Sequence, residues 1–295
     1  MEQTRRKKKH KKRSQWILLA PVMIFVIGAG IFLYPAVSNF LAEKQQREII
    51  HTYEANVKSE DAQKLEEAWE EAVRYNENLA GDPVHDPFIM GSGYILPDNY
   101  EAVLNVGGDG VMGYLEIPKI DIYIPIYHGT SEEVLQKGAG HLESTALPIG
   151  GKYARPVISA HRGLPSAELF TRLDEMENGD VFYIHVLDKV LAYETESIEV
   201  IEPEELEYLV PEDGRDLVTL LTCTPYAVNT HRLLVTGTRV PYEEAKAAEN
   251  ESKPQTGIWV KEYIFAAAIG LCILIIMIIL FFTVRRRKRR KRKRR

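Results

Sequence analysis

Two long runs without a charged residue, one near each end of the chain, constrain the fold more than any other feature. No Asp, Glu, Lys or Arg occurs in residues 14–41 or 263–284. A helix of about 20 apolar residues crosses the hydrocarbon core of a membrane, and a buried core helix rarely runs so long without a charge. Membrane-spanning helices are therefore predicted over residues 16–37 and 258–284.

Basic tails flank the two runs and predict their orientation. Residues 1–15 carry eight Lys or Arg, and residues 285–295 are all Lys or Arg. Because basic residues near a span favour the cytoplasmic side, both termini are expected inside a two-pass cell-membrane protein, with residues 42–257 on the extracellular face. Beside a membrane the tails are expected to contact anionic lipids, so a nucleic-acid partner is not predicted.

The first run has a second interpretation as a cleaved signal peptide. Ala36-Val37-Ser38 has the small-x-small pattern of a signal-peptidase site. The run is longer than the apolar part of a typical signal peptide, so an uncleaved anchor is favoured and cleavage stays open.

The outer region divides by composition into a helical part, a loop, a β-rich part and a linker. Residues 42–80 have apolar residues at helical spacing among Glu, Gln, Lys and Ala, which predicts a helical extension. Two Pro and three Gly make residues 81–93 a loop. Residues 94–240 are predicted to form a mainly β domain, a barrel or a sandwich. Residues 241–257 are polar and are expected to be a solvated linker.

Short β-like runs separated by turn residues support the β prediction. Seven or eight strands are expected, and a hairpin turn is predicted at Leu187-Asp188-Lys189. The runs are 113–118, 120–127, 156–161, 180–186, 190–200, 216–223 and 232–240.

Cys223 is the candidate nucleophile. It ends an apolar run and precedes Thr224-Pro225, which places the thiol at the rim of a sheet. The other cysteine, Cys272, lies in the second apolar run, so an intramolecular disulfide is not expected. A thiol in this setting is a nucleophile, a buried small hydrophobic group or one half of an intermolecular bridge, and composition alone does not decide.

Arg232 begins the next strand after a connection of eight residues, so a hairpin brings it opposite Cys223. A cation beside the sulfur favours the thiolate and stabilises an oxyanion on a carbonyl under attack. An ordinary hairpin with a surface arginine is the alternative.

Thiol catalysis also needs a proton carrier, because the leaving amine must be protonated. His161 follows a strand-like run and precedes Arg162-Gly163, so it also lies where a strand enters a loop. His231 is the second candidate because it adjoins Arg232, but neighbouring residues of a strand point to opposite faces. From the residues alone the choice between them stays open.

These motifs together resemble those of a known family. Thr219-Leu-Leu-Thr-Cys223 resembles the TLxTC signature of sortases, Ser159-Ala-His161-Arg-Gly is similar to their histidine motif, and Arg232 lies where their catalytic arginine follows the cysteine. The loop around Asp86, Pro87 and Phe88 resembles the lid of class C sortases, the pilin-polymerising subgroup. The second span and the N-terminal helical extension also resemble features of that subgroup. The resemblance covers about residues 45–240.

The resemblance implies an eight-stranded β-barrel and a membrane-anchored cysteine transpeptidase of Gram-positive surfaces. It implies that Cys223 cleaves an LPxTG-type sorting signal between Thr and Gly, that His161 transfers protons and that Arg232 holds the substrate carbonyl. The acceptor is a pilin lysine amine, and no metal or cofactor is required. Thr222 and Thr224 flank the cysteine and are second-tier candidates for oxyanion or substrate support, since strand threonines are often packing residues.

Three other functions remain open from the sequence. A housekeeping sortase uses the same three residues to attach surface proteins to the cell wall. Another cysteine enzyme, such as a peptidase or a peptidoglycan transpeptidase, shares the thiol and imidazole without releasing a tail at Thr-Gly. A non-enzymatic membrane-tethered adhesion module leaves Cys223 inert. Thiol reactivity separates the last from the rest, and lysine-dependent oligomers separate the pilin polymerase.

Overall fold

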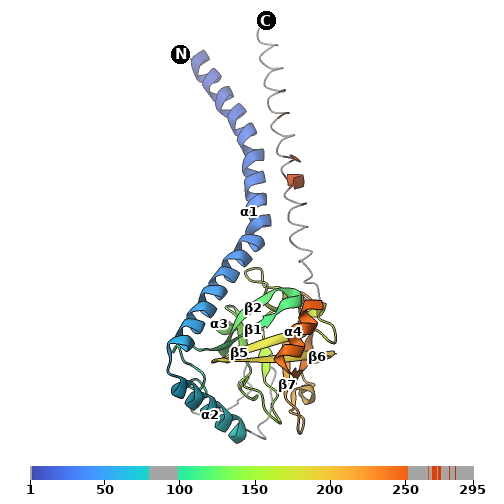
Figure 1. Ribbon diagram of the computed structural model, residues 1–295. Coiled ribbons are helices and arrows are strands. Elements are labelled where there is room, and N and C mark those ends of the chain that lie inside the picture. The colour runs from blue at the N-terminus through green and yellow to red at the C-terminus, as the bar shows by residue number, and fades with distance from the viewer. Residues whose placement is uncertain are drawn as a thin grey trace. The chain divides into compact units, whose positions relative to one another are not determined.

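The structure is a computed structural model that describes residues 2–79 and 99–251 and eight further residues between 265 and 283 (Figure 1). The chain divides into two compact units, one of residues 1–34 and 255–295 and the other of Pro35–Pro254. The loop predicted to be a lid, with Asp86, Pro87 and Phe88, lies outside the described residues.

One described helix is long and apolar enough to cross a membrane, over Met23–Ser59, judged by length and composition. It overlaps the first predicted span and suggests a membrane anchor. Most of the second predicted span, residues 258–284, lies outside the described residues, as does the basic tail at 285–295.

Four α-helices, three 3-10 helices and eight strands make up the described chain. In chain order they are α1 (Glu2–Ser59), α2 (Ala62–Leu79), β1 (Val111–Ile117), η1 (Pro118–Ile120), β2 (Ile122–His128), α3 (Glu132–Leu135), β3 (Ala139–His141), β4 (Val157–Ser159), η2 (Leu169–Glu175), β5 (Val181–Val186), β6 (Lys189–Ile201), η3 (Leu206–Leu209), β7 (Leu217–Thr224), β8 (His231–Val240) and α4 (Tyr242–Glu251).

The eight strands close into a barrel in the order β1-β2-β3-β4-β7-β8-β6-β5. The pairs β2–β3 and β4–β7 are parallel, and the other neighbours are antiparallel. Alternate residues of the strands fill the main core with aliphatic side chains, among them Leu115, Ile124, Ile184, Leu220 and Val235. The predicted mainly β, eight-stranded barrel is confirmed.

All seven predicted runs form strands, and β3 is the one strand that the sequence pattern missed. It contains only Ala139-Gly140-His141 and has no alternation of apolar and polar residues. Its pairing with β2 and β4 holds it in the barrel. Gly140 is required there, because a Cβ at that position would lie 2.3 Å from the carbonyl oxygen of Gly129.

The helical extension forms as predicted but in two pieces. Asp61 separates α1 from α2, and its carboxylate accepts a hydrogen bond from Gln63 N at 2.8 Å, which caps the second helix. The extension is fastened to the barrel by Tyr53, whose hydroxyl donates to Met112 O at 3.1 Å and accepts from Leu187 N at 2.7 Å. The hairpin predicted at Leu187-Asp188-Lys189 forms between β5 and β6, with Leu187 and Asp188 as its turn and Lys189 already paired in β6.

The solvated linker expected over residues 241–257 is wrong for its first part, because residues 242–251 form α4. Ala245 is buried against Val181 and Tyr183 of β5, and Tyr183 donates a hydrogen bond to Glu249 at 2.9 Å. The polar residues that predicted a linker form the exposed face of α4, and its small residues form the stripe that packs on the barrel.

Candidate active site

Cys223 and Arg232 face each other across the β7–β8 hairpin. The antiparallel register pairs Cys223 with Arg232 directly, as the spacing predicted. Both are buried, with 8% of Cys223 and 5% of Arg232 exposed. The guanidinium donates Nη1–H to the carbonyl oxygens of Asn229 and His231, at 3.3 and 3.2 Å, so the connecting loop holds it in place.

The two side chains lie on the outer face of the barrel wall. Leu220 and Leu233 belong to the main core, whereas Leu221 and Leu234 belong to a second cluster with Leu209 of η3. Side chains alternate along a strand, so Cys223 and Arg232 share the face of Leu221 and Leu234. The thiol therefore lies on the outward-facing side of this wall, near the end of β7.

His161 is brought to the same rim by β4. The parallel β4–β7 ladder ends with the pair Ser159–Leu221, and Ala160 N still donates to Leu221 O at 3.2 Å. Continuing this register by two residues places His161 level with Cys223 and on the same face. Its side chain is 21% exposed. The segments that carry His161, Cys223 and Arg232, namely the end of β4, β7 and β8, are thus neighbours in one wall.

Side chains extend the β4–β7 pairing past the last backbone bond, on both sides of the cysteine. Thr222 donates its hydroxyl hydrogen to Ala160 O at 2.7 Å. Arg162 donates Nη1–H to Thr224 Oγ1 at 2.9 Å. We call this set of two bridges the threonine clamp. The only hydroxyl hydrogen of Thr222 is used in this bridge, whereas Thr224 accepts in its bridge and its hydroxyl hydrogen is not used there.

The turn after His161 is fixed by η2. Phe170 N donates to His161 O at 3.1 Å, and Gly163 N donates to Thr171 Oγ1 at 3.1 Å. Asp174 of η2 pairs with the second nitrogen of Arg162. Gly163 has φ +80°, and a Cβ there would lie 2.9 Å from the ring of Tyr226, so both backbone and space require glycine. Arg162 and Gly163 of the histidine motif therefore shape the loop that carries the imidazole.

Glu132, the first residue of α3, places a carboxylate at this rim. Its Oε2 lies 3.6 Å from His161 Nε2. The sequence did not predict a role for Glu132, because α3 is far from both motifs in the chain and no local pattern indicates its contact with His161. The structural roles of Arg162 and Gly163 were not predicted either, although both residues belong to the histidine motif.

The other histidines of the described barrel have different surroundings. His141 is fully buried between the Tyr100 hydroxyl, 2.9 Å from Nδ1, and Ala146 O, 2.8 Å from Nε2. Burial lowers the pKa of His141 to about 3, so its ring is neutral. His231, the second candidate, pairs with Thr224 and contacts Thr230 through Nδ1 at 2.8 Å, on the face opposite to that of Arg232.

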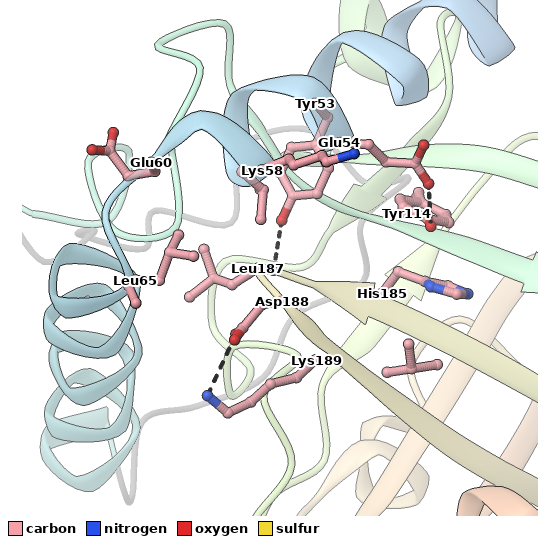
Figure 2. Close-up of a pocket in the computed structure, with 13 residues that line it drawn as sticks. Tyr53, Glu54, Lys58, Glu60, Leu65, Tyr114, His185, Leu187, Asp188 and Lys189 are labelled. Atoms are coloured by element: carbon pink, nitrogen blue, oxygen red, sulfur yellow. Dashed lines mark hydrogen bonds and ion pairs between the residues drawn. The ribbon is translucent and has the colours of Figure 1, made fainter.

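A cavity of about 410 Å³ lies elsewhere on the barrel, between the helical extension and the β5–β6 hairpin. Figure 2 shows it with Tyr53 reaching the backbone of Leu187 and with Glu54 bonded to Tyr114. None of Cys223, His161 and Arg232 lines it. Apolar side chains, including Val57, Leu65 and Leu187, form part of its wall. The chemistry is assigned to the rim and not to this cavity, because no cysteine is among the residues that line the cavity.

No group of three or more His, Cys, Asp or Glu suited to a metal ion occurs within the part of the chain that the structure describes.

Comparison with known proteins agrees with the motifs. A model of the sortase domain matches residues 115–240. A crystal structure of Streptococcus pneumoniae sortase C, described as informing catalysis and pilin substrate specificity, is 48% identical, with a TM-score of 0.61 over 66% of this chain and 97% of that one. The chain belongs to the sortase family. Sortases are cysteine transpeptidases that act on LPxTG-type sorting signals.

Further relatives include both pilin-type and other sortases. Streptococcus agalactiae sortase C1 is 44% identical, with a TM-score of 0.61 over 65% of this chain and 97% of that one. Sortase A of Bacillus anthracis is 24% identical over 221 residues, which are 74% of this chain and 92% of that one. This sortase is thus similar to class C structures over nearly their whole length.

Proposed function

We propose that this sortase is a class C pilin polymerase, which cleaves an LPxTG-type signal between Thr and Gly and joins the Thr carbonyl to a pilin lysine. The observation that carries the proposal is the direct Cys223–Arg232 pair, with His161 level with the thiol in the continued β4–β7 register. The similarity to class C structures, one of them described in terms of pilin specificity, supports the choice of substrate.

In the first half-reaction the Cys223 sulfur, as the thiolate, attacks the Thr carbonyl carbon. Arg232 lies opposite the sulfur and donates hydrogen bonds to the oxyanion that forms. Protonated His161 delivers its proton to the Gly nitrogen as the C–N bond breaks. The products are a thioester on Cys223, a free Gly amine and neutral His161. Thr224 is a candidate second donor, since its hydroxyl hydrogen is not used in the threonine clamp.

In the second half-reaction neutral His161 accepts a proton from the lysine amine, whose nitrogen attacks the thioester carbonyl. A C–N bond forms, the C–S bond breaks, and Cys223 leaves as a thiolate beside the Arg232 cation. The isopeptide product contains no group from the enzyme. His161 is protonated again, so the site returns to its starting state.

We place the barrel on the extracellular face of the cell membrane, with both termini in the cytoplasm and a second span at residues 258–284. The apolar α1 and the two basic tails support this topology. A substrate anchored in the same membrane by its own apolar tail would meet the enzyme at a raised effective concentration.

The test is to mix the full chain in detergent with a pilin that bears an LPxTG-type signal. We expect SDS-resistant ladders whose joints are Thr–Lys isopeptide bonds by mass spectrometry, and none with Cys223→Ala. Transfer only to a small glycyl amine would support cell-wall anchoring instead, and a pilin that stays uncleaved would refute both functions.

A further inference from the structure

The carboxylate of Glu132 is held toward His161 by neutral neighbours. Gln136, one turn later, donates Nε2–H to Glu132 Oε1 at 2.8 Å. Ser131 caps the start of α3, since its hydroxyl accepts from Val134 N at 3.3 Å. With Oε1 engaged, the Oε2 atom is the one that lies 3.6 Å from His161 Nε2. The orientation of the carboxylate is therefore built into the first turn of α3.

The Glu132 carboxylate is also open to a second molecule. Its side chain is 58% exposed, and that of His161 is 21% exposed. Within the described part of the chain, His161 is the one basic side chain within 4.0 Å of this carboxylate. The next residue differs, because Glu133 pairs with Lys137 at 2.6 Å. Glu132 thus presents a negative charge that no Lys or Arg among those residues neutralises.

We propose that Glu132 binds the ammonium group of the acceptor lysine and so selects a cationic amine for the second half-reaction. The inference rests on the proposed function, since it names the residue that recognises the acceptor. An ammonium held at Oε2 lies next to His161 Nε2, the atom that must take its proton. Attraction to a cation raises the local concentration of lysine and gives a water molecule no such advantage.

The proton path follows from this placement. The lysine ammonium loses one proton to the solvent, its neutral nitrogen attacks the thioester carbonyl carbon, and His161 takes the second proton from that nitrogen. The C–N bond forms and the C–S bond breaks, with the electron pair leaving on the Cys223 sulfur. Glu132 binds the substrate cation and itself exchanges no proton, so a glutamine at this position keeps the shape and removes the attraction.

The experiment compares two acceptors on the same acyl-enzyme. The full chain in detergent is acylated with an LPxTG-type peptide and resolved at pH 7.5 by a blocked lysine peptide, which is a cation, or by hydroxylamine, which is neutral. We expect Glu132→Gln to lower the ratio of the lysine to the hydroxylamine kcat/KM by about fivefold, mainly through a higher KM for lysine. Raising the ionic strength should lower this ratio in the wild type and not in the variant. Glu133→Gln is the matched control and should leave the ratio unchanged.

Two results would overturn the inference. An unchanged ratio with both rates lowered would mean that Glu132 acts only through His161, and an unchanged ratio with unchanged rates would mean that it binds nothing. Failure of the wild type to form a thioester on Cys223 would refute the proposed function itself, and the inference with it. Thermal unfolding of each variant checks that the fold is intact.

Discussion

Two outer walls of the barrel each carry a histidine next to a glutamate, but the surroundings of the two pairs differ. On the wall of β4, β7 and β8, His161 lies 3.6 Å from Glu132. On the wall of β1, β2 and β5, His185 lies 3.0 Å from Glu116. The second pair is the tighter, yet its imidazole is stacked on Tyr114 with the ring centroids 4.2 Å apart, and no thiol adjoins it.

The two walls differ in the neighbours of the histidine–carboxylate pair, and those neighbours distinguish the wall of the proposed catalytic site. Tyr114 is engaged by Glu54 of α1 at 2.7 Å, and Arg47 of α1 lies over the ring of Tyr123, so the helical extension covers that wall. The first wall instead brings a thiol and a guanidinium into register with its histidine. One wall fastens the extension, and the other carries the thiol, the guanidinium and the imidazole of the proposed site.

The largest expected effect separates the two histidines. His161→Ala should lower the kcat/KM of transpeptidation by about 10³-fold, because general acid and base catalysis is lost. His185→Ala should leave it unchanged within error. Peptide cleavage followed by chromatography measures both values. Equal losses of kcat/KM in the two variants would contradict the proposal that His161, and not His185, is catalytic.

The threonine clamp should matter for catalysis more than an equivalent bridge at the other end of the same strands. Arg162→Gln should lower kcat by about 10²-fold with little change in KM, because the cysteine and histidine lose their alignment. Thr224→Val removes the same bridge and also the candidate oxyanion donor, so it should lower kcat at least as much, and adding Arg162→Gln to it should lower kcat little further.

Arg155 provides the control for the clamp. It donates Nε–H to Thr219 Oγ1 at 3.2 Å, between the segments of β4 and β7 that lie away from Cys223. Arg155→Gln should lower the free energy of unfolding and leave kcat unchanged. If Arg155→Gln lowers kcat as much as Arg162→Gln, the clamp has no special role in alignment.

On the covered wall the effect should be one of stability. Tyr53→Phe removes the hydroxyl that Leu187 N and Met112 O share, which should lower the free energy of unfolding by about 2 kcal/mol. Burial raises the pKa of Tyr53 to about 12, so the neutral hydroxyl is the form removed. Denaturant unfolding measures the loss, and unchanged kcat/KM is expected. A loss of activity without a loss of stability would contradict the purely structural role given to the covered wall.

The effect that is smallest near neutral pH concerns His141, which lies on neither outer face. Its folded pKa is lowered to about 3, against about 6.5 in an unfolded chain. Between these values acidification protonates the unfolded state only, so the contribution of His141 to stability is complete above pH 6.5 and is lost as the pH falls toward 3. The slope from this residue approaches about 1.4 kcal/mol per pH unit.

His141→Gln should remove that slope. Denaturant unfolding at several pH values between 6.5 and 4 should show the wild type losing stability faster than the variant. Parallel curves would mean that His141 has the same pKa in the folded and unfolded states.

The sequence predicted the β7–β8 hairpin and its Cys223–Arg232 pairing because an apolar run, a Thr-Pro stop and a fixed connection length determine register locally. It did not predict β3, whose strand conformation comes from its neighbours. The sequence also did not predict the contact of Glu132 with His161, because the two residues are 29 positions apart and the contact depends on how α3 packs beside the end of β4. Local pattern sets strands and turns, whereas contacts between distant segments follow from barrel closure.

The polar residues after β8 also depend on contacts between distant segments for their structure. Residues 242–251 were expected to be a linker because most of them are polar, and the stripe of Ala245 and Ala248 is too short to stand out. Only the apolar surface of β5 and β6 gives that stripe a place to pack.

The most direct test of the account is the mass of the intact protein after incubation with an LPxTG-type peptide in the absence of any amine. The account predicts an added mass equal to the peptide portion that ends in Thr, carried on Cys223, and released by hydroxylamine. An adduct on Cys272, or an unmodified protein with uncleaved peptide, would contradict the claim that Cys223, His161 and Arg232 form one transpeptidase site.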